Sequence, residues 1–257
     1  MSSPEIVHRW AKGKFLDSGV SGIVELLPNG HVIKSPWPGH QEADCQADMA
    51  LEARVYQRLS DLFSTHKRFV RVVEYDEAEC ALTMQCMTNG TLRAYLEAHN
   101  TILSEGQRYR WIHAMTEGLD MLHSANIVHC DFSPRNMLLD DALELKVADF
   151  GCVSMDDSKT FGGGSARFYH PKTLSRDRIG IDGDLFALGS SIFEVLTGRP
   201  PYADLDTSSV RALYDLQQYP DLQGLKGGDV IRDCWLFQAN SARRIYQRVK
   251  TVMPLQV

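Results

Sequence analysis

The sequence predicts an α+β fold with two lobes, a small lobe rich in β-strands with one helix and a larger lobe that is mainly helical. Two observations predict it. Up to about residue 87 the apolar residues come in short runs separated by turn residues, apart from one helical stretch, whereas after Asn89-Gly90 they recur mostly at helical spacing. No internal repeat and no long Pro/Gly/Ser-rich linker separates the parts, so we expect one continuous domain over residues 1–257. Within it we expect a first lobe at about 1–86, a hinge at about 85–90 and a second lobe at about 90–257.

The first lobe is expected to hold several strands and one helix. Residues 14–34 predict two or three strands, joined in part by the Pro-Asn-Gly turn at 28–30. Residues 42–59 show apolar spacing typical of a helix. Two further apolar runs, 69–75 and 80–87, flank an acidic turn and predict a hairpin.

The second lobe is expected to be built from helices. Ser104 stands where a helix cap is preferred, directly before a long stretch of helical spacing. The predicted helices span residues 92–99, 104–125, 184–197, 208–217 and 242–253.

Composition excludes several classes of protein. With 257 residues, 44% of them hydrophobic and 23% charged, the chain is able to bury a large core. The formal charge is −6 and no basic run interrupts it, which argues against nucleic acid and anionic membranes as partners. Residues 1–14 lack the apolar core of a signal peptide, and no apolar stretch approaches the roughly 20 residues that span a bilayer. We therefore expect an intracellular protein, cytoplasmic or nuclear.

The cysteines favour a reducing compartment. They are scattered, and no two form a Cys-x-x-Cys pair, so reduced thiols are expected. Redox sensitivity of Cys130 or Cys152, which lie within the motifs described next, is the alternative. The six positions are Cys45, Cys80, Cys86, Cys130, Cys152 and Cys234.

The strongest chemical signal lies in residues 128–139, Val-His-Cys-Asp-Phe-Ser-Pro-Arg-Asn-Met-Leu-Leu. Within it, Asp131 supplies a carboxylate able to accept a proton from a hydroxyl, and Asn136 supplies a neutral oxygen suited to a magnesium ion. Asp149-Phe150-Gly151 follows after an apolar run and offers a second carboxylate.

This segment resembles the H-x-D-x-x-x-x-N catalytic loop of the protein kinase family, and the resemblance extends from Gly19 to at least Gly198. It implies a bilobal protein kinase-like fold that binds ATP and Mg²⁺. Asp131 is then the catalytic base, Asn136 and Asp149 are the metal ligands, and His129 packs inside the lobe. The chain looks most like short, divergent kinase-like proteins of fungi.

The resemblance also assigns the groups that hold the triphosphate. Gly19 and Gly22 lie in the segment that would close over the phosphates, although a simple glycine hairpin is the alternative. Val32-Ile33-Lys34 is similar to the family's V-A-I-K element, whose lysine pairs with the α- and β-phosphates, whereas a lone strand lysine is usually solvated. Glu52 is our choice for its acidic partner, over Glu42 and Asp48, because apolar residues follow it at helical spacing.

The adenine site is likewise implied by the resemblance. Val24, Val32 and Leu138 would line an apolar slot for the base. Met84 would limit the depth of the pocket, and the backbone groups of Gln85 and Met87 would read the adenine edge. Further on, residues 184–189 and 197–202 resemble the start and the end of the family's central helix, a combination that small-molecule phosphotransferases usually lack.

Three departures from the family pattern concern the nucleotide loop and the activation segment. Asp17 replaces the first glycine and places a carboxylate near the triphosphate. Cys130 replaces an arginine that often binds an activating phosphate, so we expect activity without phosphorylation of Ser154, Ser158, Thr160 or Ser165. Lys172 replaces a glutamate whose usual partner looks to be Arg243, so two cations must separate or find other anions.

The acceptor is only mildly specified. Ser133 stands where Ser/Thr kinases usually carry lysine, and Arg135 stands where many tyrosine kinases carry arginine. The guanidinium of Arg135 would supply positive charge near the γ-phosphate, so we count it among the catalytic residues.

The sequence therefore predicts an ATP-dependent protein kinase that moves the γ-phosphoryl group to a protein hydroxyl, with Ser/Thr slightly preferred over Tyr. Its partners are then protein substrates and ATP, and the oligomeric state stays open. Two alternatives remain: a pseudokinase scaffold that binds ATP without transfer, and a small-molecule phosphotransferase.

Overall fold

The computed structural model describes residues 10–39, 41–64, 66–158, 164–174 and 179–255. Thr160 and the greater part of the amino-terminal segment discussed above lie outside these residues. The chain divides into two compact units, an N-terminal unit of Met1–Thr65 with Val70–Cys86, and a C-terminal unit of His66–Phe69 with Met87–Val257.

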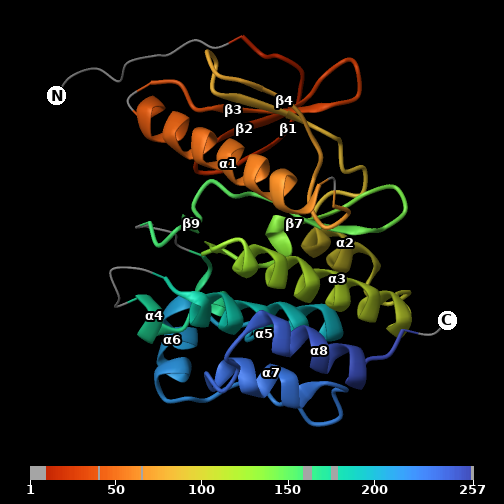
Figure 1. Ribbon diagram of the computed structural model, residues 1–257. Coiled ribbons are helices and arrows are strands. Elements are labelled where there is room, and N and C mark those ends of the chain that lie inside the picture. The colour runs from red at the N-terminus through yellow and green to blue at the C-terminus, as the bar shows by residue number, and fades with distance from the viewer. Residues whose placement is uncertain (1–9, 40, 65, 159–163, 175–178, 256–257) are drawn as a thin grey trace. The chain divides into compact units, whose positions relative to one another are not determined.

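The described residues of the N-terminal unit form a five-stranded antiparallel sheet with one helix (Figure 1). The strand order is β1-β2-β3-β5-β4. Helix α1 packs on β3 and β5 and buries one face, whose residues recur at three- and four-residue intervals from Cys45 to Leu59. The elements are β1 (Lys14–Ser18), β2 (Gly22–Leu26), β3 (Val32–Pro36), α1 (Glu42–Phe63), β4 (Val72–Asp76) and β5 (Ala81–Met84).

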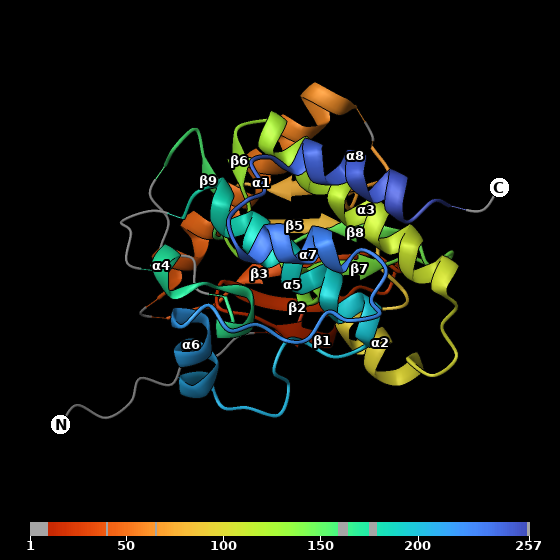
Figure 2. The ribbon, with the colours of Figure 1, turned by 90° about the horizontal axis from the view of Figure 1, so that it is seen from below.

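The C-terminal unit is mainly helical and is organised around α5 (Ile181–Thr197). Every residue of α5 from Gly183 to Val195 is buried, because α3 and α7 pack against it (Figure 2). Helix α8 packs in turn on α3. The other helices are α2 (Leu92–His99), α3 (Glu105–Ser124), α4 (Pro171–Leu174), α6 (Thr207–Asp215), α7 (Gly228–Trp235) and α8 (Ala242–Val252).

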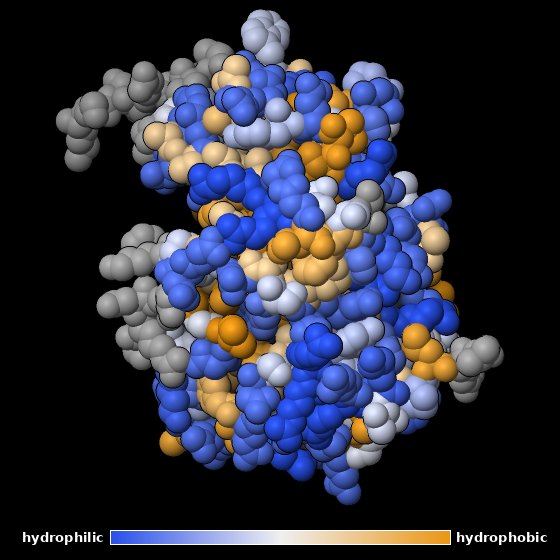
Figure 3. Space-filling model, in the orientation of Figure 1, coloured by the Kyte–Doolittle hydropathy of each residue, from blue (hydrophilic) through white to orange (hydrophobic). Residues whose placement is uncertain are grey.

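Two short strand pairs support the loops of this unit. β7 (Met137–Leu139) pairs with β8 (Leu145–Val147), and β6 (Ile127–Val128) pairs with β9 (Ser154–Met155). One 3₁₀ turn, Pro134–Asn136, leads directly into β7, and a second spans Ala166–Phe168. Hydrophilic residues predominate on the face of this unit that Figure 3 shows. Among the described residues, no helix is long and apolar enough to cross a membrane.

These elements confirm the predicted α+β fold, with a strand-rich N-terminal part and a helical C-terminal part. α2 has the predicted bounds, and Ser104 caps α3 by accepting a hydrogen bond from Gln107 N at 3.2 Å. One strand boundary was predicted wrongly. The hairpin strand expected from residue 69 begins at Val72, because Phe69 instead pairs with Val147 in the C-terminal unit. Helices α4 and α7 and the short strands β6 to β9 were not predicted.

Candidate active site

The N-terminal unit buries the predicted Lys34–Glu52 ion pair. Lys34 Nζ lies 2.7 Å from Glu52 Oε2, and the two side chains are 10% and 1% exposed. Both rival acids are engaged elsewhere: Glu42 accepts a hydrogen bond from Gly39 N, and Asp48 accepts one from Ser21 Oγ at 2.9 Å. Glu52 faces the sheet because it lies on the buried stripe of α1.

Strand register gathers the predicted nucleotide residues of this unit on one face of the sheet. Val24 of β2 lies opposite Lys34, and Val32 of β3 lies opposite Met84 of β5. Directly opposed residues share a face, and so do residues two apart in one strand, so all four side chains lie on the same side. The backbone N–H of the next residue, Gln85, donates to Arg71 O at 3.0 Å, which leaves its carbonyl oxygen as the group able to read a base.

The glycine-rich segment forms a closed turn. Gly19 N donates to Gly22 O at 2.9 Å, and Trp37 Nε1 donates to Gly19 O at 2.8 Å. A β-carbon on Gly22 would overlap the carbonyl oxygen of Ser35, so glycine is needed there for β2 to approach β3. The sequence predicted that the N–H of Gly19 would face a phosphate. In this conformation it donates its hydrogen bond within the turn instead.

In the C-terminal unit a buried carboxylate anchors the loop that leads to Asp131. Asp184, in the first turn of α5, accepts hydrogen bonds from His129 N at 2.7 Å and Cys130 N at 2.9 Å. A third contact comes from His123 Nε2 at 2.9 Å. Cys130 has a left-handed φ of 65°, a conformation that costs about 1 kcal/mol or more for a residue other than glycine. The anchor holds that conformation in place.

Asp131 is held by its neighbours on the same loop. Asn136 Nδ2 donates to Asp131 Oδ2 at 2.9 Å and to Asp131 O at 2.8 Å. Burial raises the pKa of the Asp131 carboxyl, and the charge of Asp149 adds to the rise, while His129, Asn136 and Arg135 oppose it. Arg135 itself is exposed. A carboxyl with a raised pKa, oriented by an amide, is suited to accept a proton.

The expected packing of His129 is present. The side chain is fully buried, with its ring 5.5 Å from Phe132 and 5.6 Å from Phe150, and Nε2 donates to Ala148 O at 3.1 Å. Asp131 N donates to Nδ1, which fixes this tautomer. The Phe150 ring also lies against Phe69 at 6.2 Å.

The β7–β8 hairpin brings the two predicted metal ligands to one end. Met137 pairs with Val147, so Asn136, one residue before this pair, and Asp149, two residues after it, both follow from the open end of the hairpin. Ala148 N donates to Asn136 O at 2.9 Å, which ties the two loops together. Asp149 is exposed and has a left-handed φ of 64°.

The donor chemistry of this pair fits magnesium. Asn136 uses its NH₂ group toward Asp131, so its amide oxygen is the atom that could serve as a metal ligand. Magnesium usually takes one or two protein carboxylates together with water and phosphate oxygens. No group of three His, Cys, Asp or Glu side chains able to hold a metal ion occurs in the part of the chain that the structure describes.

The segment after the predicted hinge runs along β7. Asn89 N donates to Leu139 O at 3.1 Å, Leu139 N donates to Gly90 O at 2.9 Å, and Thr91 bridges to Leu138. Leu138 and Met87, the predicted adenine contacts of this unit, therefore belong to adjoining segments of backbone.

The structure also places the departures from the family pattern. Cys130 is buried against Tyr169 and Ile179, and burial raises the pKa of its thiol, so it lacks the exposed thiolate that redox sensing requires. Burial raises the pKa of the Asp120 carboxyl in α3, and the charge of Arg243 opposes this rise. Arg243 therefore has a carboxylate near it. The backbone N–H of Lys172 donates to His170 Nδ1.

Three residues at this site were not predicted: Asp184, His123 and Gly164. An acid at the start of the otherwise apolar α5 was a visible signal for Asp184, since a buried charge must have partners. A β-carbon on Gly164 would lie 2.6 Å from Asp131 Oδ1, so the backbone at Gly164 approaches the Asp131 carboxylate closely. The sequence has three consecutive glycines at 162–164, and nothing in it indicated that Gly164 lies close to Asp131.

Comparisons with known proteins agree with this arrangement. A family model described as "Protein kinase domain" matches residues 31–231. Human mitogen-activated protein kinase kinase kinase 3 is 29% identical over 240 residues, which cover 85% of this chain and 37% of that protein. Mitogen-activated protein kinase kinase kinase 17 of Arabidopsis thaliana is 24% identical over 248 residues, 90% of this chain and 65% of that protein. Serine/threonine-protein kinase PLK4 of Nematostella vectensis is 31% identical over 141 residues, 53% of this chain and 14% of that protein.

The fold and these motifs define a protein kinase of the eukaryotic type. The chain belongs to the protein kinase domain family, whose model covers more than half of it. It spans well under half the length of the human relative that it matches.

Proposed function

We propose that this chain is a catalytically active protein kinase that transfers the γ-phosphoryl group of Mg-ATP to a protein hydroxyl, with serine or threonine preferred. The observation that carries the proposal is the support of Asp131. Its carboxylate is oriented by Asn136 at 2.9 Å on a strained loop that the buried Asp184 anchors. A scaffold that acts through surface contacts alone has no chemical need for this arrangement.

Each polar residue then has one role. Lys34, braced by Glu52, neutralises and orients the phosphates, and Arg135 adds positive charge beside the transferred group. Asp131 orients the acceptor hydroxyl and takes its proton. Asn136 and Asp149 would hold magnesium, which when bound supplies charge neutralisation to the phosphate oxygens. Gly19, Gly22, Val24, Val32, Met84, Gln85, Met87 and Leu138 are proposed to contact the nucleotide.

The relatives support the choice of acceptor. Two groups of matched proteins are named as mitogen-activated protein kinase kinase kinases and as serine/threonine-protein kinases. For this chain the preference for serine or threonine rests on that likeness, because the residues at positions 133 and 135 do not agree on the acceptor. A location inside the cell, in cytoplasm or nucleus, belongs to the same proposal.

The test is transfer of radiolabelled γ-phosphate to generic protein substrates by the wild type and by Asp131→Asn. We expect transfer by the wild type, its loss in Asp131→Asn, and unchanged transfer in the matched control Asp141→Asn, an exposed carboxylate on the β7–β8 turn. Acid hydrolysis of the product should release phosphoserine or phosphothreonine.

Two results would contradict the proposal. Nucleotide binding without transfer by the wild type would favour the pseudokinase scaffold. The observation that supports this alternative is the closed Gly19–Gly22 turn, which follows Asp17 in the sequence. Transfer to metabolites alone would favour a small-molecule phosphotransferase.

A further inference from the structure

The glycine loop, residues 19–22, has lost one of the N–H groups expected to bind phosphate. Gly19 N donates to Gly22 O at 2.9 Å and is used within the loop. The backbone N–H groups of the next two residues, Val20 and Ser21, have no hydrogen-bond partner among the described residues. They lie at the tip of the loop, where the Val20 side chain is 91% exposed. These two N–H groups are therefore donors that the loop can offer to a ligand.

Two side chains that follow β3 hold the carbonyl groups of this loop. Trp37 Nε1 donates to Gly19 O at 2.8 Å. Cys45 Sγ donates to Val20 O at 3.7 Å. The peptides are trans, and in a trans peptide the C=O and N–H groups point in opposite directions. The N–H groups of Val20 and Ser21 therefore point away from the side chains that hold the carbonyls.

A third contact joins the loop to α1. Ser21 Oγ donates to Asp48 Oδ2 at 2.9 Å. Asp48 lies three residues after Cys45 and four residues before Glu52, so the three side chains follow one face of the helix. The helix whose Glu52 braces the buried lysine therefore also holds the loop. We call Trp37, Cys45 and Asp48 the loop clamp.

The chain around Trp37 is stiff. Trp37 lies between Pro36, the last residue of β3, and Pro38. Each proline fixes its own φ at about −65°, and Pro38 also restricts the residue before it to an extended backbone. The indole is thus carried by a segment with few accessible backbone conformations, so its contact with the loop costs little conformational entropy.

We propose that the loop clamp is a positioning device, which aims the N–H groups of Val20 and Ser21 at the phosphate oxygens of the nucleotide. Successive backbone N–H groups in a turn form a concavity that binds anions. The inference deepens the proposed function, on which it rests for the nature of the ligand. It also names the donors that take the place of the Gly19 N–H. A nucleoside without phosphates gains nothing from the clamp.

The first test compares binding of Mg-ATP and of adenosine to Trp37→Phe by isothermal titration calorimetry. The variant keeps an aromatic ring but lacks the indole N–H, so one hydrogen bond to the loop is lost. We expect Mg-ATP to bind about fivefold more weakly than to the wild type, and adenosine to bind equally well. A variant that merely loosened the N-terminal unit would lose affinity for both ligands, and that result would overturn the clamp.

The matched control is Trp10→Phe, the same substitution at a tryptophan that is 93% exposed. Both affinities should equal those of the wild type. The indole N–H groups of the ¹⁵N-labelled chain report the contact itself, because a hydrogen-bonded N–H exchanges with solvent more slowly than a solvated one. Trp37 Nε1–H should therefore exchange more slowly than Trp10 Nε1–H. Equal exchange rates would overturn the clamp.

Two variants of Asp48 test the contact with α1. Asp48→Asn keeps an amide oxygen that can accept from Ser21 Oγ and should bind Mg-ATP as Asp48→Ala does not, with affinities about fivefold apart. Both variants remove the same negative charge, so their difference isolates the hydrogen bond. Equal affinities of the two variants would show that this contact does not position the loop.

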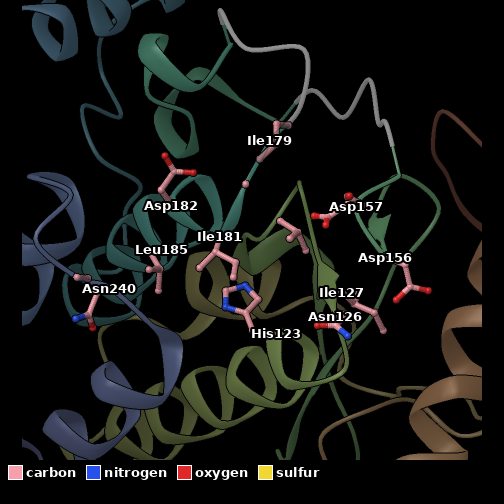
Figure 4. Close-up of a pocket in the computed structure, with 14 residues that line it drawn as sticks. His123, Asn126, Ile127, Asp156, Asp157, Ile179, Ile181, Asp182, Leu185 and Asn240 are labelled. Atoms are coloured by element: carbon pink, nitrogen blue, oxygen red, sulfur yellow. The ribbon is translucent and has the colours of Figure 1, made fainter.

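A control in the C-terminal unit separates the clamp from general effects on the fold. A cavity of about 670 Å³ opens there beside the end of α3, strands β6 and β9 and the start of α5 (Figure 4). None of the described residues that line it belongs to the glycine loop or to the loop clamp. Asn240→Ala, at an exposed position of this lining, should leave Mg-ATP binding unchanged. A loss of affinity as large as that in Trp37→Phe would overturn the clamp.

Transfer assays distinguish failure of the inference from failure of the proposed function. In Trp37→Phe the KM for ATP should rise about fivefold, while the KM for the protein acceptor stays unchanged. If the wild type binds Mg-ATP but transfers nothing, the proposed function fails and the titrations still decide the clamp. Equal or tighter binding of Mg-ATP by Trp37→Phe would overturn the clamp whether or not the wild type is active.

Discussion

Glu52→Ala is expected to destabilise the N-terminal unit strongly and to abolish transfer. The Lys34 Nζ to Glu52 Oε2 distance is 2.7 Å, and both side chains are almost fully buried. At an effective dielectric of about 20, two unit charges at this separation attract by about 6 kcal/mol. Desolvation offsets much of that attraction, but removing one partner leaves Lys34 buried with an uncompensated charge. The expected net loss is therefore about 3–5 kcal/mol.

Hydrogen exchange along α1, read together with thermal unfolding, measures this loss. Exchange is preferred because a chain of two compact units need not unfold in one step. The matched control is Glu42→Ala, at an exposed position in the first turn of the same helix, where a change within about 0.5 kcal/mol is expected. Protection of α1 in Glu52→Ala equal to that in Glu42→Ala would refute the reasoning.

A double variant separates stability from function. Lys34→Met/Glu52→Leu replaces the pair by apolar side chains, which in buried sites is often neutral or stabilising. We expect near wild-type protection of α1 with no phosphoryl transfer. Retained transfer would show that the amine of Lys34 is not needed.

Three further expectations follow from single contacts. Burial raises the pKa of the Asp131 carboxyl, and the charge of Asp149 adds to the rise. Because transfer needs the ionised carboxylate, the rate should fall on acidification already above the ordinary aspartate pKa of about 4. A pH–rate profile whose acid limb lies at about 4 would contradict this. Gly164→Ala places a β-carbon 2.6 Å from Asp131 Oδ1 and should lower turnover with little change in melting temperature. In the control Gly106→Ala the added β-carbon has no neighbouring atom closer than 4.0 Å, so turnover should stay intact. Equal turnover of the two variants would refute the contact. Burial lowers the pKa of His170, so between that lowered pKa and about 6.5 the unfolded chain binds a proton that the folded chain does not. The free energy of unfolding should therefore decline as the pH falls through this range. Thermal unfolding should show a smaller decline in His170→Gln than in the wild type, and equal declines would count against this reasoning.

Local signals made much of the fold predictable. Helix α2 begins where predicted because Thr91 caps it by accepting a hydrogen bond from Ala94 N at 3.2 Å. The same periodicity that predicted α1 placed Glu52 on its buried stripe, three residues from both Met49 and Val55. The resemblance of Lys34 to the family's lysine called for an acidic partner, and this position made Glu52 the choice.

Helix α7 was missed although its apolar pattern is regular. Val230, Ile231, Cys234 and Trp235 are all buried and follow the spacing of a helix face. The preceding Gly227-Gly228 looked like a loop. In the structure Gly227 has a φ of 85° and supplies the left-handed residue at which the chain turns into the helix.

The parts of the site that could not be predicted depend on tertiary contacts. The distance in sequence between Asp184 and the backbone that it anchors is more than fifty residues, and no local pattern encodes that contact. Asn136 and Asp149 were expected to act together from the family resemblance alone, because the β7–β8 hairpin that brings their two loops to one end gave no local signal. Each of the two strands has three residues, a length that periodicity rarely reveals.

Cys130, which stands where the family often has arginine, is buried in a small apolar cluster. Its side chain is 2% exposed and packs with Tyr169 and Ile179, and the hydroxyl of Tyr169 donates a hydrogen bond to the Cys130 carbonyl. This packing ties Cys130 to Tyr169, and we expect it to position the neighbouring segment without a phosphate. Ser154 is buried and donates to Ser158 O at 2.6 Å, which further disfavours its modification.

Two variants test this substitution of packing for charge. Alanine at Ser154, Ser158, Thr160 and Ser165 together should leave turnover largely intact, because no phosphate is needed to place the segment. Cys130→Arg should not create phosphate dependence; it puts an unpaired cation into the apolar cluster and should destabilise the chain by about 3 kcal/mol or more, seen as a lower melting temperature and lost turnover. A collapse in rate with the four alanines, or an arginine variant that melts like the wild type and gains activity on phosphorylation, would mean that charge and not packing positions the segment.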